Sequence, residues 1–193
     1  ENLMRILLLN YLDTSKPGGI SKVVREFGSG LARLGHTVKM IQPMKPDGEE
    51  SGEYLGFRYT GLIRTFGLHH YRIGDIGRII KHIRDFSPEV INIHGSRNIL
   101  SPLTVINVKR AFPDIPLIYS PHHDSKSGVT FSGRYLFWLH KILLLRRAYQ
   151  NADMITVCSE FEELQVSGSY FGRSDKIRVI PNGIDEPNRI LKK

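Results

Sequence analysis

The sequence has a single cysteine and no run of apolar residues long enough to cross a membrane. Cys158 can form no internal disulfide, and because it lies in an apolar stretch we expect a small core side chain rather than a nucleophile. A membrane-spanning helix needs roughly 20 consecutive apolar residues, and runs such as Ile142–Leu145 fall far short. No secretory signal pattern is recognisable, so we expect a cytoplasmic protein.

Motifs that identify several functional classes are also missing. No Gly-x-Ser-x-Gly elbow supports hydrolysis by an activated serine. The histidines at positions 94, 122 and 123 follow no zinc-ligand spacing, and we expect neither a metal nor another cofactor. The net charge of +8 favours an anionic partner. No nucleic-acid-binding motif accompanies that charge, so we expect no nucleic acid partner.

The sequence does contain a regular alternation of strand and helix patterns. With 193 residues, 40% of them hydrophobic, the chain can bury a core as one domain. The alternation predicts an α/β fold with a doubly wound, mainly parallel sheet and helices on both faces. Polar residues 43–56 predict an exposed loop, and 63–71 are ambiguous. Strands are predicted at 6–9, 37–41, 57–60, 89–93, 115–120, 152–157 and 176–180, and helices at 20–34, 73–83, 99–111, 131–150 and 159–170.

The first predicted strand leads into a helix through a glycine pair, Gly18 and Gly19. A pair of residues without side chains lets backbone N–H groups at the start of a helix approach an anion such as a pyrophosphate. The other interpretation is a plain tight turn. The full G-x-G-x-x-G spacing of a dinucleotide site is absent, so the spacing alone leaves both interpretations open.

Polar side chains follow several of the predicted strands. Because the carboxyl ends of parallel strands meet at one edge of a sheet, we expect these side chains to form a pocket. Neighbouring residues of an extended segment point in opposite directions, so only one of His122 and His123 should face it. The candidates are Asn10, Tyr11, Asp13, His94, Ser159, His122, His123 and Asp124.

The predicted helix over 131–150 is apolar around most of its circumference, and Arg134, Trp138 and Lys141 share one stripe. One interpretation is a helix buried on several sides whose basic side chains extend to water. The other is an aromatic and basic surface that contacts a membrane from the cytoplasmic side.

Five segments follow one another along the chain: PGGI at 17–20 with VVREFGSGLARLGHTV, EVINIHGS at 89–96, SPHHD at 120–124, ADMITVCSEFEE at 152–163 and KIRVIPNGID at 176–185. In this order they resemble the N-terminal half of a GT-B glycosyltransferase of family 4, with its Rossmann-like fold. The resemblance implies retaining transfer of a sugar from a UDP- or GDP-linked donor to a glycan or a lipid-linked acceptor. It implies that His122 lies at the reaction centre and that Gly18 and Gly19 lie near the donor diphosphate.

The same resemblance implies that acceptor-binding residues lie nearby, namely Asn10, Tyr11, Asp13, His94 and Asp124. It further implies an acceptor-binding domain over 1–185, the start of a linker at 186–193, and a donor-binding domain outside this sequence. We therefore expect the chain alone to be inactive and to bind nucleotide sugars weakly. Two alternatives remain: a noncatalytic α/β module that binds anionic lipid or RNA, and half of a nucleotide-sugar epimerase.

Overall fold

The computed structural model describes residues 2–11, 18–43, 51–54, 56–63, 65–66, 70–71, 74–96, 99–122, 141–170 and 174–183. The strands are β1 (Arg5–Asn10), β2 (Thr37–Pro43), β3 (Ser51–Tyr54), β4 (Phe57–Ile63), β5 (Thr65–Phe66), β6 (His70–Tyr71), β7 (Val90–His94), β8 (Leu117–Ser120), β9 (Met154–Val157) and β10 (Ile177–Val179). The helices are α1 (Gly19–Arg33), α2 (Asp75–Phe86), α3 (Leu100–Ala111), a π-helical turn (Lys141–Leu145) that continues into α5 (Arg146–Asn151), and α6 (Glu160–Tyr170), with a 3₁₀ turn at Ser174–Lys176.

Eight of the strands form one sheet in the order β10-β9-β8-β7-β1-β2-β4-β3. The central strand β1 pairs in parallel with β2 on one side and with β7 on the other. The order of the strands reverses at this point, and open α/β sheets bind ligands beside such a reversal. Only β3 runs antiparallel, against β4. The predicted doubly wound, mainly parallel α/β sheet is therefore confirmed.

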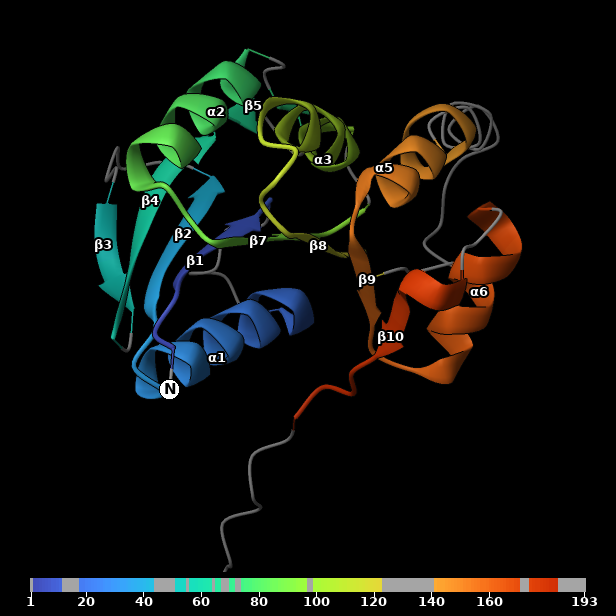
Figure 1. The fold of residues 1–193 in the computed structure, drawn as a ribbon, viewed down its shortest axis with the longest axis horizontal. Helices are drawn as coiled ribbons and strands as arrows, with labels where there is room; N and C mark the ends of the chain where they lie inside the picture. The colour runs from blue at the N-terminus through green and yellow to red at the C-terminus, as the bar shows by residue number, and fades with distance from the viewer. Residues whose placement is uncertain are drawn as a thin grey trace, which may run out of the picture.

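The sheet has two unequal faces, because side chains alternate along each strand. In β1, Leu7 and Leu9 belong to the larger core cluster, whereas Ile6 and Leu8 belong to the smaller one. Helices α2, α3 and α5 lie over the face with the larger cluster, and α1 lies beneath the other face (Figure 1). The smaller cluster joins α1 to β1, β2 and β4, and Tyr54 of β3 packs against it.

Helix α1 packs closely against this smaller face because a glycine sits at the contact. A Cβ atom added at Gly28 would lie 2.9 Å from the ring of Phe57 and 3.2 Å from Leu8. A larger residue would therefore push the helix away from the sheet. The helix ends near Gly35, whose φ of +88° is a left-handed conformation that favours glycine.

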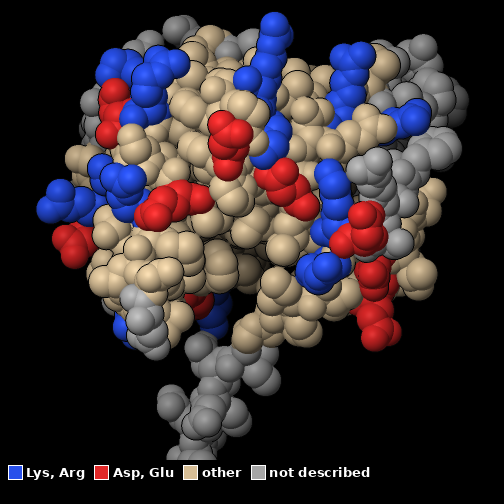
Figure 2. Space-filling model, viewed as in Figure 1, with Lys and Arg blue, Asp and Glu red and all other residues tan. Residues whose placement is uncertain are grey.

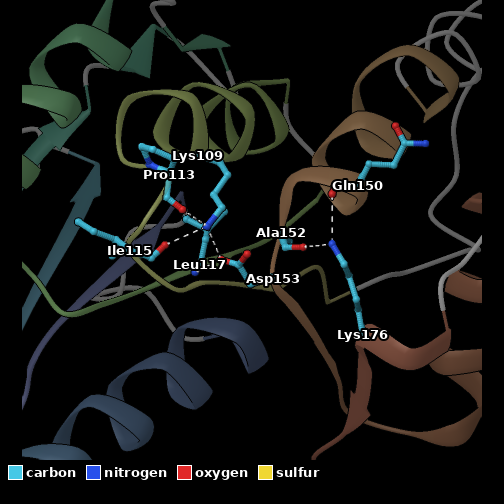
Figure 3. A network of polar contacts seen from close by, with 8 residues as sticks. All are labelled: Lys109, Pro113, Ile115, Leu117, Gln150, Ala152, Asp153 and Lys176. Carbon is cyan, nitrogen blue, oxygen red and sulfur yellow. Dashed lines mark hydrogen bonds and ion pairs between the residues drawn. The ribbon is translucent and has the colours of Figure 1, made fainter.

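At the amino ends of β8 and β9, polar groups hold the loops to one another (Figure 3). Lys109, in the last turn of α3, donates to Asp153 at 2.7 Å and to the carbonyls of Pro113 and Ile115 at 2.7 and 3.2 Å. The same carboxylate oxygen accepts the backbone N–H of Leu117 at 2.8 Å. Asp153 thus ties the first residue of β8 to the loop before β9.

A second lysine holds the next pair of strands in the same way (Figure 3). Lys176, directly before β10, donates to the carbonyls of Gln150 and Ala152 at 3.2 and 2.8 Å. These carbonyls lie at the end of α5 and directly before β9. The ammonium of Lys176 therefore links the end of α5 to the start of β10.

The structure corrects one local prediction, resolves one ambiguous stretch, and describes only part of a third segment. The predicted exposed loop over 43–56 is wrong at its end, because Ser51–Tyr54 form β3 along the edge of the sheet, where Tyr54 stacks on Phe57. The ambiguous stretch 63–71 contributes the end of β4 and the short β5 and β6 pair. Of the predicted helix over 131–150, residues 131–140 lie outside the described residues. No helix within the described ranges is long and apolar enough to span a membrane.

Candidate functional site

Beyond the edge of α1, the smaller face of the sheet is open over β7, β8 and β9. A pocket of about 760 Å³ lies there, between α1, these strands and the residues that follow β10. Figure 2 shows the surface hollowed between α1 and the end of β10. The pocket is lined by Gly19, Lys22, Val23, Glu26, Phe27, Arg33, Asn92, His94, Ile118, Ser120, His122, Met154, Thr156, Val157, Cys158, Ile180, Pro181, Asn182 and Gly183.

The floor of the pocket carries a row of hydrogen-bonded polar side chains, one from each strand. Ser120 of β8 donates to Oδ1 of Asn92 in β7 at 3.0 Å, and its hydroxyl lies 2.5 Å from Oγ1 of Thr156 in β9. A parallel strand covered on both faces normally carries apolar residues. The polar row therefore marks the part of the sheet that faces a ligand or solvent rather than a helix.

The sides of the pocket are partly apolar. Phe27 of α1, Met154 of β9 and Ile180 are 42%, 37% and 57% exposed. Lys22 and Glu26 add charged groups of both signs on the α1 side. An apolar lining with a few polar groups that converge on one point is typical of small-molecule sites.

Two histidines meet at the carboxyl ends of β7 and β8. Nδ1 of His94 lies 3.1 Å from Nε2 of His122, a hydrogen-bond distance. Their rings stack with centroids 5.4 Å apart and planes inclined by 17°. The ring of Phe27 meets His94 edge-on at 6.3 Å. His94 is 3% exposed, and within the described chain its Nε2 is buried with no hydrogen-bond partner.

Burial keeps both histidines neutral near pH 7. The pKa of His94 is lowered well below the ordinary value of 6.5, first by burial and then by the neighbouring His122. The pKa of His122 is also lowered by burial, against an opposing effect of the Glu162 carboxylate. A neutral imidazole has one donor and one acceptor nitrogen, so each ring can both give and accept one hydrogen bond.

The backbone around this pair is unusual at two positions. His122 has a φ of +48°, a left-handed conformation that is costly for a residue with a side chain. Gly95, directly after β7, has a φ of +93° and donates its N–H to the carbonyl of Ser120 at 2.8 Å. The carbonyl of Gly95 accepts from Tyr119 Oη at 3.0 Å and from Ser101 Oγ. Hydrogen bonds through Gly95 thus tie the end of β7 to the end of β8, where the histidines meet.

The glycine pair lies at the mouth of the same pocket. Gly18 caps α1, and Gly19, the first residue of the helix, lines the pocket. A Cβ atom added at Gly19 would meet nothing within 4 Å, so the packing of the protein does not require glycine there. The open space over Gly19 leaves the first N–H groups of a helix accessible from the pocket.

Cys158 lines the pocket, and its thiol donates to Glu162 at 3.0 Å. The prediction that Cys158 is a core side chain is wrong, because the thiol is half-buried and lines the pocket. Burial, together with the carboxylate of Glu162, raises its pKa. Ser159 caps α6 by accepting the N–H of Glu162 at 3.2 Å, whereas the carboxylate of Glu162 accepts the N–H of Cys158 at 2.8 Å.

The structure brings together some of the predicted site residues and separates others. His94, His122 and Gly19 line one pocket, with Gly18 directly beside it. Tyr11 does not join them, because it is buried on the opposite face of the sheet with its hydroxyl bonded to Thr104.

Asn10 is the register partner of His94 but is buried and does not line the pocket. Five predicted residues lie outside the described chain or its described side chains: Asp13, His123, Asp124, Arg134 and Trp138. Of Lys141 only the backbone is described, in the π-helical turn. Within the described residues, no group of three His, Cys, Asp or Glu side chains could hold a metal ion.

Sequence reasoning missed the polar floor of the pocket. Its signal was nonetheless present, because Asn92 and His94 are the two polar positions of an otherwise apolar strand and are separated by one residue. Ser120, the last residue of β8, and His122 repeat this spacing. Polar residues at every second position indicate one open face of a strand.

Comparisons with known proteins agree with the fold. Residues 17–186 match the model of Glycosyltransferase Family 4. The chain is similar to a glycosyltransferase from Rickettsia africae ESF-5, with 14% identity and a TM-score of 0.62 over 96% of this chain and 44% of that one. It is also similar to a putative UDP-N-acetylglucosamine 2-epimerase from Listeria monocytogenes, with 10% identity and a TM-score of 0.50 over 92% of this chain and 44% of that one.

The chain spans less than half the length of these two solved proteins. Identities this low show a shared fold alone. A search among curated proteins finds no match.

Proposed function

The chain belongs to Glycosyltransferase Family 4, and on this premise we propose that it forms the acceptor-binding half of an enzyme that transfers a sugar from a nucleotide to an acceptor. In the proposed reaction, the bond from the sugar C1 to the diphosphate breaks and a bond from C1 to an acceptor oxygen forms with retained configuration. The acceptor proton leaves with the released nucleoside diphosphate.

One observation carries the proposal: the histidine pair, the polar floor and the open start of α1 share a single pocket. Hydroxyl and amide groups suit a ligand rich in hydroxyls, and the exposed ring of Phe27 suits the C–H face of a sugar. The helix start at Gly18 and Gly19 suits the diphosphate of the donor.

Within this proposal His122 contacts the sugar that is transferred. Because its lowered pKa leaves the ring neutral, His122 acts by a hydrogen bond to a sugar hydroxyl and not as a fixed positive charge. We propose UDP- or GDP-linked donors and a glycan or lipid-linked acceptor. We also propose a cytoplasmic location. Membrane contact through Arg134, Trp138 and Lys141 stays a prediction.

The direct test is transfer by the full-length protein that contains this chain. The protein is incubated with UDP- and GDP-sugars and a panel of glycan and lipid-linked acceptors. The anomeric configuration of the product is then determined by NMR. We expect His122→Ala to lower kcat by at least about 100-fold, with circular dichroism and Tm close to those of the wild type.

A matched control is His36→Ala. His36 lies before β2 at the opposite end of the sheet, where its Nδ1 accepts the N–H of Met4 at 3.2 Å. Its loss should leave transfer unchanged. Equal loss of transfer in both variants, or release of an epimerised sugar without any acceptor product, would overturn the proposal and favour the epimerase alternative.

A further inference from the structure

The two histidines of the pocket differ in what surrounds them. His94 sits in β7 with 3% of its surface exposed, whereas His122 is half-buried and lies after β8 in a left-handed turn. Nε2 of His122 is bonded to Nδ1 of His94 at 3.1 Å. Both rings line the pocket, so one nitrogen of His122 is already occupied within the protein.

We propose that His94 is a positioning residue for His122, whose ring it holds so that Nδ1 of His122 is the nitrogen presented to the ligand. This inference rests on the proposed transferase function for its consequence, but its geometric content stands without it. A neutral imidazole can carry its proton on either nitrogen. Nε2 of His94 is buried with no partner among the described residues, and buried N–H groups are rarely left unpaired, so we expect the proton of His94 on Nδ1, which donates to Nε2 of His122. His122 then carries its own proton on Nδ1.

Three features make His94 suitable for this task. Its backbone lies in the centre of the sheet, paired with β1 and β8 at Asn10 and Ser120. Its ring is confined between His122 and Phe27, with stacked and edge-on contacts. Burial lowers its pKa, so it remains a neutral hydrogen-bonding group instead of becoming a second positive charge beside the ligand.

The turn at His122 explains why such a partner is needed. A left-handed conformation at a residue with a side chain is sustained only when the surroundings determine it. The turn directs the ring of His122 back toward β7, where the hydrogen bond and the stack with His94 meet it. Without His94, the ring would be free to adopt other rotamers within the pocket.

Two substitutions separate positioning from packing. His94→Leu introduces an apolar side chain of similar size and removes the hydrogen bond to His122, whereas His94→Asn places a polar atom near the position of Nδ1. In the full-length protein we expect His94→Leu to lower kcat about tenfold with little change in KM, because a small misplacement of a reacting group is costly. His94→Asn should recover kcat to within about threefold.

The decisive readout is the tautomer of His122 in the full-length protein labelled with ¹⁵N at histidine. We expect a single tautomer in the wild type and an averaged mixture in His94→Leu at neutral pH. His36→Leu, which removes a comparable Nδ1 hydrogen bond at the other end of the sheet, should leave His122 unchanged.

A mixture of tautomers in the wild type, or one unchanged tautomer in His94→Leu, would overturn the inference. Equal kcat in the wild type and His94→Leu would also overturn it. If the wild-type protein transfers no sugar, the proposed function fails, and the tautomer of His122 still decides whether His94 positions it.

Discussion

The two ends of the sheet at strands β7, β8 and β9 use polar residues in opposite ways. At their amino ends, Lys109 and Asp153 satisfy each other and the surrounding loop groups. At their carboxyl ends, the pair of His94 and His122 leaves one buried ring nitrogen of His94 without a partner among the described residues. Buried polar groups are normally paired, so an exception needs an explanation.

The difference indicates a division of work along the same strands. A network in which every group has a partner holds the loops and contributes to stability. A site must instead keep hydrogen-bonding groups available for its ligand. Substitutions at the amino ends should therefore lower stability and leave ligand binding unchanged. Substitutions at the carboxyl ends should impair ligand binding and change stability little.

The largest effect on stability is expected from Lys109→Met. The substitution leaves the carboxylate of Asp153 without its ammonium and two carbonyls without a donor. We expect the free energy of unfolding to fall by about 2 kcal/mol, because hydrogen bonds to charged groups are among the strong ones. Urea denaturation measures it, and a change below about 0.5 kcal/mol would contradict the comparison.

Lys176→Met should cost less, because Lys176 contacts two carbonyls and no carboxylate among the described contacts. We expect a loss of about 1 kcal/mol, measured in the same way. Lys81→Met is the matched control, since Lys81 pairs with Asp85 on the exposed surface of α2, where such pairs contribute little. Equal losses in both variants would contradict the role of Lys176.

At the other end, Thr156→Val removes one hydroxyl from the floor of the pocket and keeps the shape of the side chain. Ser120 retains Asn92 as a partner, so we expect a loss of only about 0.5 kcal/mol in unfolding free energy. Binding of the acceptor should weaken severalfold by calorimetry, whereas Lys176→Met should bind it normally. If Thr156→Val binds the acceptor with unchanged affinity, the polar floor does not take part in acceptor binding.

The smallest effect is expected from mild acid. The folded-state pKa values of His94 and His122 lie below the unfolded value of 6.5, so the unfolded chain takes up protons first as the pH falls. Their contribution to stability is therefore complete above about pH 6.5 and is lost at lower pH. Denaturation between about pH 7.5 and about pH 5.5 should show this slope.

His82 acts in the same direction, because burial also lowers its pKa. The contribution of His94 to this pH dependence is therefore the difference in slope between the wild type and His94→Asn, which cannot take up that proton. Identical slopes for the two proteins would contradict the lowered pKa of His94.

The order of strands and helices was predictable because each buried parallel strand is a short apolar run bounded by turn residues. The run Ile6–Leu9 is of this kind, and the helix that follows it, α1, is marked by an apolar stripe at helical spacing. Strand β3 was not predictable, since its sequence SGEY is polar and its pairing depends on contacts with β4. An edge strand is stabilised by its neighbour more than by its own residues.

Part of the site was predictable by the same reasoning. His94 and His122 follow strands that end at one edge, and their convergence follows from parallel pairing. Tyr11 was misplaced because a polar hydroxyl at the end of a strand can also satisfy a buried partner, here Thr104. The contact between the two histidines depends on the left-handed turn at His122, which no sequence pattern specifies.

The close contact at Gly28 has a consequence for how this pocket can change. Gly28 faces the sheet in the middle of α1, whereas Gly19 at the start of the same helix faces the pocket. A rigid helix moves as one body, so a methyl group added at Gly28 would lift Gly19 as well. A substitution at Gly28 would therefore change the distance between α1 and the sheet, and with it the ligand preference of the pocket, although Gly28 itself does not line the pocket.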